Sequence, residues 1–404
     1  MLPAAEAEQL ILSLTQPLDA RLAAETVALD SAFGRILATT VTSQLDFPHW
    51  DNSAMDGYAV RYEDVQQVPT ALRVVEEIPA GQPPQQPVTA GQAARIFTGG
   101  MLPAGADTIV MQEDTERSGD QVKILSAPQP QAFVRHRGAF YQAGDALLPP
   151  GIVINAPELA VLAAAQCTQV SVYRRPRVAL LSTGNELVSP DRPLQPGQIV
   201  DSNQVALAAL VAQSGAIPLR MGIVPDRPEA LKAAIASAFD QADLVISTGG
   251  VSVGDYDYVD RILGELGAQL HIRSVAVKPG KPLTVAAAAE ALYFGLPGNP
   301  VSALVGFWRF VQPALRKLSG QSDGWGPPMV TAITEADLKA GGRRETYLWG
   351  QLHLSESGYR FQLAAGSHSS GNLVNLRGTS GLAVVPIGST TLAAGSSIRV
   401  LSLL

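Results

Sequence analysis

The spacing of apolar residues predicts two kinds of local structure in the first part of the chain. A helical period occupies the N-terminus, where apolar residues recur every three or four positions at Ala7, Leu10, Ile11 and Leu14. A second apolar run, 29–37, is interpreted as another packing helix, and helical spacing returns after Pro157. If the later helix rejoins the first ones, the segment between them is an insertion.

That intervening segment, 45–138, has the pattern of a small β domain. Short β-type runs at 72–75, 94–97, 108–111 and 121–125 are separated by turns rich in Gly and Pro.

The segment 177–318 alternates buried-type strands with helical patterns and is expected to form a doubly wound α/β domain. The predicted strands are 178–181, 219–224, 244–247, 275–277 and 292–295. The predicted helices are 205–214, 228–239, 258–267 and 301–318. After a turn-rich linker at 319–324, short strands return and continue to the C-terminus.

Three loops of this domain follow apolar strands and run into helices, so they should meet at the carboxyl edge of one parallel sheet, where α/β sheets bind ligands. They are 182–186 (STGNE), 247–255 (STGGVSVGD) and 295–302 (GLPGNPVS). Backbone N–H groups at such helix starts suit a phosphate. Neither the P-loop nor the G-x-G-x-x-G fingerprint is present, and for any single loop a plain tight turn is an equal alternative.

Composition narrows the class of protein. At 404 residues several domains are expected, and a net charge of −7 without a basic stripe argues against nucleic-acid binding. One cysteine, Cys167, excludes an internal disulfide framework and fits a reducing compartment, by default the cytoplasm. The N-terminus lacks the pattern of a signal peptide, and no apolar run is long enough to span a bilayer.

Charged residues near the loops suggest the chemistry. Carboxylates without a His or Cys cluster favour Mg²⁺ bound together with a substrate phosphate, the candidates being Glu186, Asp201, Asp226, Asp255 and Asp257. Helix capping is the alternative for Asp201 and Asp226. Lys278 and Lys281 lie on a proline-rich turn that suits a phosphate or small oxyanion, unless both lysines are merely solvated. The histidines show no paired metal-ligand spacing, and Cys167 is expected to fill the core.

Taken together, these motifs resemble one family over essentially the whole chain. They are 51–59 (DNSAMDGYA), 98–99 (TG), 182–187 (STGNEL), 247–254 (STGGVSVG), 278–282 (KPGKP) and 295–302 (GLPGNPVS). The chain resembles the molybdopterin molybdenumtransferases, the MoeA family, which includes the C-terminal domain of gephyrin.

The resemblance implies the last step of molybdenum cofactor synthesis, in which adenylylated molybdopterin and molybdate are the substrates. Molybdate enters the dithiolene and AMP leaves in a reaction that depends on Mg²⁺. It also implies a homodimer with an intersubunit site, transient contact with the adenylyltransferase and four domains. Their predicted bounds are 1–44 with 140–175 (helical), 45–139 (inserted β), 176–319 (α/β) and 320–404 (C-terminal β).

By motif match, the resemblance also assigns roles to individual residues. Asp56 and Thr98 come from the partner subunit, and Glu186, Asp226 and Asp257 hold the metal ion. Asp56, the three metal-binding acids, Lys278 and Lys281 form the set expected to be catalytic. The expected substrate-binding residues are Thr98, Ser182, Thr183, Gly184, Thr248, Gly249, Gly250, Ser252, Gly254, Pro297, Gly298, Asn299, Pro300, Ser302 and Ser370.

Two positions depart from the family pattern. Many members have a basic residue where this chain has Ser274, and Arg273 beside it is a candidate replacement, although on a strand it would point to the other face. A position that is Arg in some members is Trp349 here, with Arg343 and Arg344 nearby.

Two other functions remain open at this point. The related molybdopterin adenylyltransferase step needs only the α/β domain, so the additional segments argue against it. A non-catalytic pterin-binding scaffold is disfavoured by the retained acids. The sequence does not decide between molybdate and tungstate.

Overall fold

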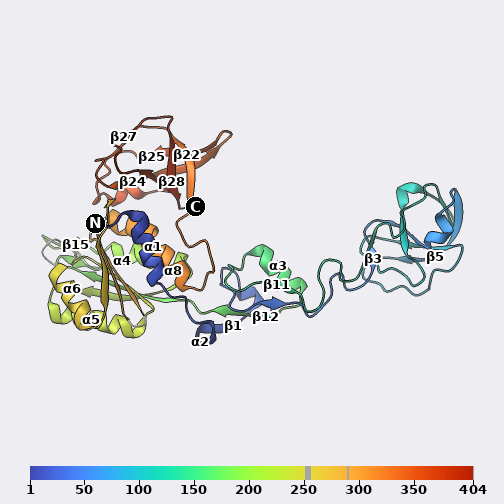
Figure 1. Ribbon diagram of the computed structural model, residues 1–404, viewed down its shortest axis with the longest axis horizontal. Helices are drawn as coiled ribbons and strands as arrows, with labels where there is room; N and C mark the ends of the chain where they lie inside the picture. The colour runs from blue at the N-terminus through green and yellow to red at the C-terminus, as the bar shows by residue number, and fades with distance from the viewer. Residues whose placement is uncertain (251–255, 289–290, 404) are drawn as a thin grey trace. The chain divides into compact units, whose positions relative to one another are not determined.

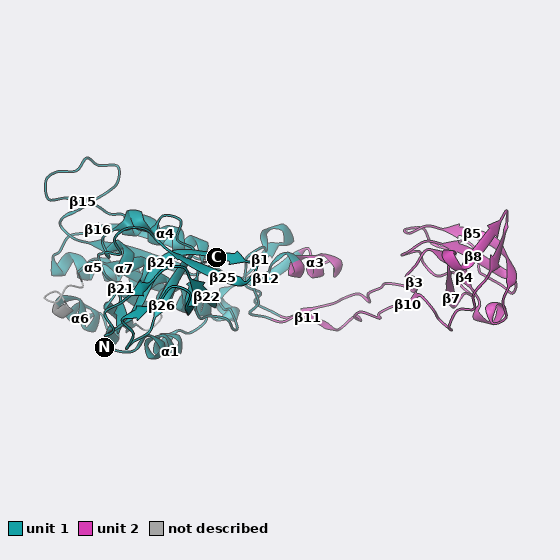
Figure 2. Ribbon diagram, turned by 90° about the horizontal axis from the view of Figure 1, so that it is seen from above, with its two compact units in different colours: residues 1–39, 150–156, 169–404 teal, residues 40–149, 157–168 magenta. Residues whose placement is uncertain are grey.

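The computed structural model describes residues 1–250, 256–288 and 291–403, with the side chains of Tyr256 and Asp257 left out. Its contacts divide the chain into two units, coloured in Figure 2. One comprises 1–39, 150–156 and 169–404, and the other 40–149 and 157–168. This division is coarser than the four predicted domains, whose boundaries stay a prediction.

The first unit contains the expected α/β sheet. Its order is β16-β13-β17-β21-β20-β18, and the first four strands run parallel. Those four are β16 (Ile217–Val224), β13 (Arg177–Thr183), β17 (Leu244–Thr248) and β21 (Leu292–Leu296). The last two, β20 (Pro282–Ala287) and β18 (Gln269–Ser274), are added antiparallel. The doubly wound prediction is confirmed for this part of the chain.

Successive side chains of a strand point to opposite faces of the sheet, and helices cover both faces. Val178 and Leu180 pack with α4 (Asn203–Gln213) and α7 (Pro300–Gly306), and Ala179 and Leu181 pack with α5 (Pro228–Gln241) and α6 (Tyr256–Glu265). In Figure 1, α5 and α6 lie on one side of the sheet and α4 on the other. Helix α7 continues through a π-helical turn (Phe307–Val311) into α8 (Gln312–Leu318), against which α1 (Ala4–Leu14) packs.

The C-terminal strands form a second, six-stranded sheet that closes on itself through an added pairing of β24 with β26. It contains β24 (Glu345–Ser355), β25 (Gly358–Leu363), β22 (Met329–Thr334), β28 (Ser397–Ser402) and β26 (Gly381–Val385). The sixth strand, β19 (Val277–Lys278), begins the proline-rich turn and pairs Lys278 with Thr346. The lysine turn is therefore hydrogen-bonded to the C-terminal sheet.

The second unit holds the predicted β segment. Its sheet has the order β7-β4-β6-β5-β9-β8 and is formed by β7 (Thr108–Met111), β4 (Gly57–Val60), β6 (Gln92–Ile96), β5 (Thr70–Ile78), β9 (Gln121–Ile124) and β8 (Thr115–Ser118). Two short strand pairs, β3 (Asn52–Ser53) with β10 (Val134–Arg135) and β2 (Val41–Thr42) with β11 (Ala146–Leu148), extend from it, and α3 (Ala156–Ala164) begins near Pro157.

Two predicted elements are wrong. The run 29–37 is not a helix: a short 3₁₀ turn (Leu29–Ser31) is followed by Gly34 at φ +70°, and Leu37 N–H donates to the carbonyl of Ile152. Neighbouring β1 (Ala24–Ala28) pairs with β12 (Gln169–Tyr173). The predicted strand 275–277 does not join the α/β sheet, because Val277 enters β19 of the C-terminal sheet.

An ion pair fixes the end of the α/β sheet opposite the ligand-binding loops. Arg174 donates to both carboxylate oxygens of Asp243, at 2.7 and 2.8 Å, and Arg177 N–H donates to Oδ2 at 2.7 Å. Burial raises the pKa of Asp243, but these hydrogen bonds outweigh burial and leave the pKa below its ordinary value.

We expect Asp243→Asn to lower the free energy of unfolding by about 2–3 kcal/mol at neutral pH, because the half-buried Arg174 loses its counter-ion. A carboxyl with a depressed folded-state pKa stabilises the fold above its unfolded pKa, near ~4, and this contribution disappears as the pH falls further. Denaturant unfolding at neutral and acid pH measures both effects. Asp240→Asn, on the exposed side of α5, is the control. Equal stability of the two variants at neutral pH would contradict the assignment.

Candidate active site

The three predicted loops lie side by side at the carboxyl edge of the parallel strands. Gly249 N–H donates to the carbonyl of Leu296 at 3.3 Å, and Thr183 Oγ1 is 3.5 Å from the carbonyl of Thr248. Gly249 has φ +87°, and a Cβ there would lie 2.2 Å from the carbonyl oxygen of Thr183. Only glycine permits this contact.

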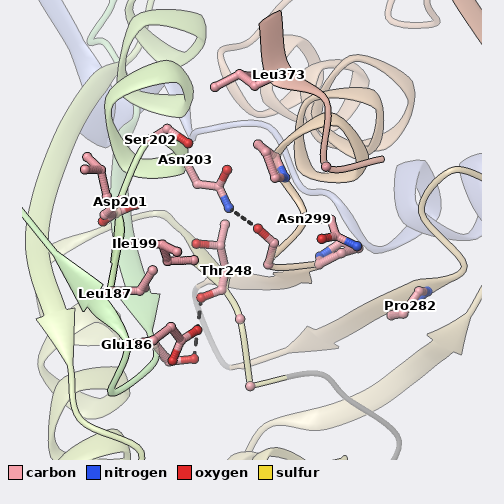
Figure 3. A pocket seen from close by; sticks show the side chains of 18 residues that line it. Glu186, Leu187, Ile199, Asp201, Ser202, Asn203, Thr248, Pro282, Asn299 and Leu373 are labelled. Atoms are coloured by element: carbon pink, nitrogen blue, oxygen red, sulfur yellow. Dashed lines mark hydrogen bonds between the residues drawn. The ribbon is translucent and has the colours of Figure 1, made fainter. Parts of the chain in front are cut away.

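A cavity of about 650 Å³ opens above these loops (Figure 3). Nine predicted residues line it: Thr183, Glu186, Thr248, Gly249, Gly250, Pro297, Gly298, Asn299 and Pro300. Its wall also includes Asp201, Ser202, Asn203 and Leu373. The volume suits a ligand of the size of a nucleotide or pterin phosphate.

Asn203 joins the wall of this cavity to the third loop. Its Nδ2 donates to the carbonyl of Gly298 at 2.8 Å, a bond drawn in Figure 3. Asp201 accepts from Gln204 N–H at 3.1 Å and caps α4, which confirms the capping alternative for this acid.

A reciprocal pair of hydrogen bonds holds Asp226 near the first loop. Asn185 N–H donates to Asp226 Oδ2 at 3.1 Å, and Asp226 N–H donates to Asn185 Oδ1 at 3.2 Å. Asp226 therefore does not cap α5, whose N-cap is Arg227. Asp226 is exposed and Glu186 lines the cavity, so carboxylates stand at two neighbouring strand ends.

The acids whose side chains are described form no tight metal centre. Among the described residues, no group of three His, Cys, Asp or Glu side chains could hold a metal ion. Mg²⁺ is commonly bound through only one or two carboxylates together with substrate phosphate and water. Glu186 lines the first cavity and Asp226 lines neither cavity, whereas the side chain of Asp257 lies outside the described residues.

A second cavity, of about 500 Å³, adjoins the first and shares Pro282, Pro297 and Asn299 with it. Its lining includes four basic side chains and, among the described residues, no carboxylate. The basic residues are Lys278, Lys281, Lys339 and Arg344. Such a surface is suited to an oxyanion.

A buried network supports one wall of this second cavity. Arg309, 5% exposed, pairs with Glu8 of α1 and donates from Nε to the hydroxyl of Tyr347 at 2.8 Å. Tyr347 in turn donates to Glu345. Burial raises the pKa of Tyr347, so the phenol stays protonated.

Asp56 and Thr98 lie in the second unit and contact each other. Thr98 donates to Asp56 Oδ1 from both its N–H and its hydroxyl, each at 2.7 Å. These hydrogen bonds lower the pKa of Asp56 and keep the carboxylate ionised.

The remaining predicted residues fall into three groups. Ser302 and Ser370 line the second cavity together with the two lysines. Ser182 and Gly184 line neither cavity: Ser182 is fully buried and accepts from Thr248 Oγ1 at 3.4 Å, and Gly184 lies against Glu186. Ser252 and Gly254 lie outside the described residues.

The candidate replacements for the family's basic contacts lie in different places. Arg273 is 69% exposed and pairs with Asp260 at 2.7 Å, so it does not replace a base at Ser274 in the cavity. Arg344 lines the second cavity, whereas Arg343 does not, and Trp349 forms part of the wall.

Sequence reasoning missed Asn203, Lys339 and His368 as cavity residues. Asn203 lies two residues after the capping candidate Asp201, and its hydrogen bond to Gly298 depends on tertiary packing. Lys339 and His368 lie in the C-terminal sheet region, far along the chain from the lysine turn. Pairing of β19 with β24 brings them near, and no local pattern signals that pairing.

Two glycine substitutions test the packing of the loops. Gly249→Ala should destabilise the fold by roughly 2–4 kcal/mol and abolish ligand binding, because its Cβ collides with the Thr183 carbonyl. Gly298→Ala is the matched control, since its Cβ meets Gly249 Cα at an ordinary 3.6 Å. Thermal unfolding measures the stability of both variants. A Gly249→Ala protein as stable as Gly298→Ala would refute the proposed close contact.

Family models match nearly the whole chain. Residues 2–165 match the MoeA N-terminal region (domain I and II), 179–317 a probable molybdopterin binding domain, and 331–403 the MoeA C-terminal region (domain IV). Among the described residues, no helix is both long and apolar enough to cross a membrane.

Curated relatives and solved structures agree with these models. A molybdopterin molybdenumtransferase of a Nostoc species is 58% identical over 98% of this chain and 92% of its own length. One from Haemophilus influenzae is 39% identical over 83% and 82%. A crystal structure of the molybdopterin biosynthesis MoeA protein from Pyrococcus horikoshii superimposes with a TM-score of 0.84, at 28% identity and 99% coverage of both chains. The chain belongs to the MoeA family of molybdopterin molybdenumtransferases.

Proposed function

We propose that this protein is a molybdenum insertase: it transfers molybdenum from molybdate to the dithiolene of adenylylated molybdopterin and releases AMP. The observation that carries this proposal is the shared wall of the two cavities. A phosphate-type cavity lined by strand-end loops meets a basic, oxyanion-type cavity at Pro282, Pro297 and Asn299. Two substrates, one phosphorylated and one an oxyanion, can therefore be held next to each other.

The residues of each cavity perform separate tasks in this scheme. Loop amides and hydroxyls around Thr248 and Gly249 hold the phosphate and pterin of the first substrate. Lys278 and Lys281 hold molybdate and offset the negative charge that develops as the phosphoanhydride is cleaved. Because the two cavities hold both substrates in a fixed relative orientation, the substrates need not meet by diffusion.

Mg²⁺ is proposed as the cofactor, held by Glu186 and Asp226, with Asp257 as the family-implied third acid. When bound, it would supply positive charge to the phosphoryl oxygens. Within the chain itself, the hydrogen bonds between Asn185 and Asp226 keep that carboxylate near the strand edge.

A homodimer is proposed to complete the site, with Asp56 and Thr98 contributed by the partner subunit. Thr98 is exposed on the second unit and Asp56 is half-buried, and the hydroxyl and N–H of Thr98 already hold the Asp56 carboxylate in a fixed orientation. The four domain boundaries predicted above, a cytoplasmic location and transient contact with the adenylyltransferase belong to the same proposal.

The two alternative functions are less well supported. An adenylyltransferase needs no basic cavity shared between the α/β domain and a C-terminal sheet, yet β19 builds one here. A scaffold without activity would not need the ionised Asp56 or the paired lysines. Neither alternative uses both cavities.

The direct test is release of AMP from adenylylated molybdopterin in the presence of the chain, molybdate and Mg²⁺. All three should be required together, and removal of the divalent cation with a chelator should stop the reaction. Release that does not depend on molybdate would contradict the proposal.

Lys278→Ala and Lys281→Ala should each lower AMP release about ten- to a hundredfold without changing thermal unfolding, because each removes a cation from the oxyanion cavity. Lys123→Ala, an exposed lysine on β9 of the second unit, is the matched control. Wild-type rates in both cavity variants would remove the role assigned to the lysine turn.

Mixing two inactive variants tests the intersubunit site. Asp56→Ala and Lys278→Ala affect different halves of the proposed site, so a mixed dimer retains one intact site. After subunit exchange at equal concentrations, about a quarter of wild-type activity should return. No recovery despite proven exchange would place Asp56 and Lys278 in the same subunit's site or outside it.

A further inference from the structure

Two aromatic side chains of the C-terminal region line the oxyanion cavity beside the lysines. Trp349 of β24 and His368 of the following loop have ring centroids 4.5 Å apart. Trp349 is 1% exposed. Its Nε1 and the Nδ1 of His368 are both buried and have no hydrogen-bond partner among the described residues. Leaving two such atoms unpaired in one wall is costly unless a ligand satisfies them.

The protonation of the His368 ring follows from its one hydrogen bond. Nε2 lies 2.9 Å from the carbonyl oxygen of Ala364. A carbonyl oxygen only accepts, so Nε2 carries a proton. In a neutral ring Nδ1 is then an acceptor, and it becomes a donor only when the ring gains a second proton.

The surroundings of His368 favour an anion. Lys278 ends β19 and Lys281 lies in the turn that follows, Lys339 comes from β23 (Leu338–Lys339) and Arg344 from the segment before β24. Tyr347 forms part of the cavity wall, and its buried phenol is already bonded to Arg309 and Glu345. No described carboxylate lines the cavity to neutralise the four basic groups, so an anion is the complementary ligand.

The position of the His368 loop is fixed against the α/β domain. Asn299 Nδ2 donates to Ser370 Oγ at 3.2 Å, and Val301 N–H donates to the carbonyl of Ser370 at 3.2 Å. The loop that carries His368 is therefore tied to the third ligand-binding loop.

We propose that Trp349 and His368 select the oxyanion: the indole N–H donates to it, and the His368 ring takes up a proton from solvent as it binds, so that Nδ1 becomes a second donor. This inference rests on the proposed function, since it assumes that molybdate occupies the basic cavity. Capture of molybdate is then linked to uptake of about one proton.

Calorimetric titration of the full-length protein with molybdate alone tests the linkage. Titrations at about pH 8 in two buffers of different ionisation enthalpy measure the protons taken up. The wild-type protein should take up about one proton per molybdate, and its affinity should rise as the pH is lowered toward ~6.

Two pairs of variants separate the roles. His368→Gln keeps a donor for the Ala364 carbonyl but lacks Nδ1, so it should bind molybdate without proton uptake. His353→Gln, an exposed histidine on the same strand as Trp349, is its control. Trp349→Phe should weaken binding about tenfold with proton uptake unchanged. Its control is Trp325→Phe, whose indole N–H already donates to the Gln321 carbonyl at 2.6 Å.

The outcomes are distinguishable. Proton uptake that persists in His368→Gln, or equal affinities of Trp349→Phe and Trp325→Phe, would overturn this inference while leaving the insertase proposal intact. Failure of the wild-type protein to bind molybdate would overturn both. Should His368→Gln be unfolded, His368→Asn offers a non-titrating amide near the Nδ1 position and should bind without proton uptake. Uptake in that variant also contradicts the proposal.

Discussion

The close contact between the ends of β13 and β17 is the constraint on which the site depends. Gly249 lies so near the Thr183 carbonyl that a side chain has no room, and Gly298 lies against Gly249 from the next strand. Because β13, β17 and β21 are parallel neighbours, the loops that follow them expose backbone N–H groups along one edge of the sheet. The first cavity exists because these loops are held this tightly.

The second cavity arises from a different feature, the departure of the chain from the α/β sheet at Val277. There the chain pairs with β24, which carries Lys278 and Lys281 to the C-terminal sheet. The Glu8, Arg309 and Tyr347 network fixes that sheet against the N-terminal helix. A phosphate-binding edge and a basic pocket therefore become neighbours, as two-substrate chemistry requires.

Much of the α/β architecture could be predicted from the sequence, because apolar strands and amphipathic helices leave a local pattern. The helix predicted over 29–37 was wrong. Its apolar residues have helical spacing, but the chain turns at Gly34, and the backbone hydrogen bonds of this run go to distant segments. The loop residues were found from their glycines. Asn203 and His368 were not, since their roles depend on contacts with Gly298 and Trp349 that only tertiary structure creates.

Whether molybdenum reaches the dithiolene is the most direct test of the central claim. The purified chain should be incubated with adenylylated molybdopterin, Mg²⁺ and molybdate, and the pterin product examined by mass spectrometry and by X-ray absorption at the molybdenum edge. The proposed function predicts a product that has lost AMP and gained molybdenum bound to both sulfurs. A metal-free molybdopterin, or an adenylylated pterin recovered unchanged, would contradict it.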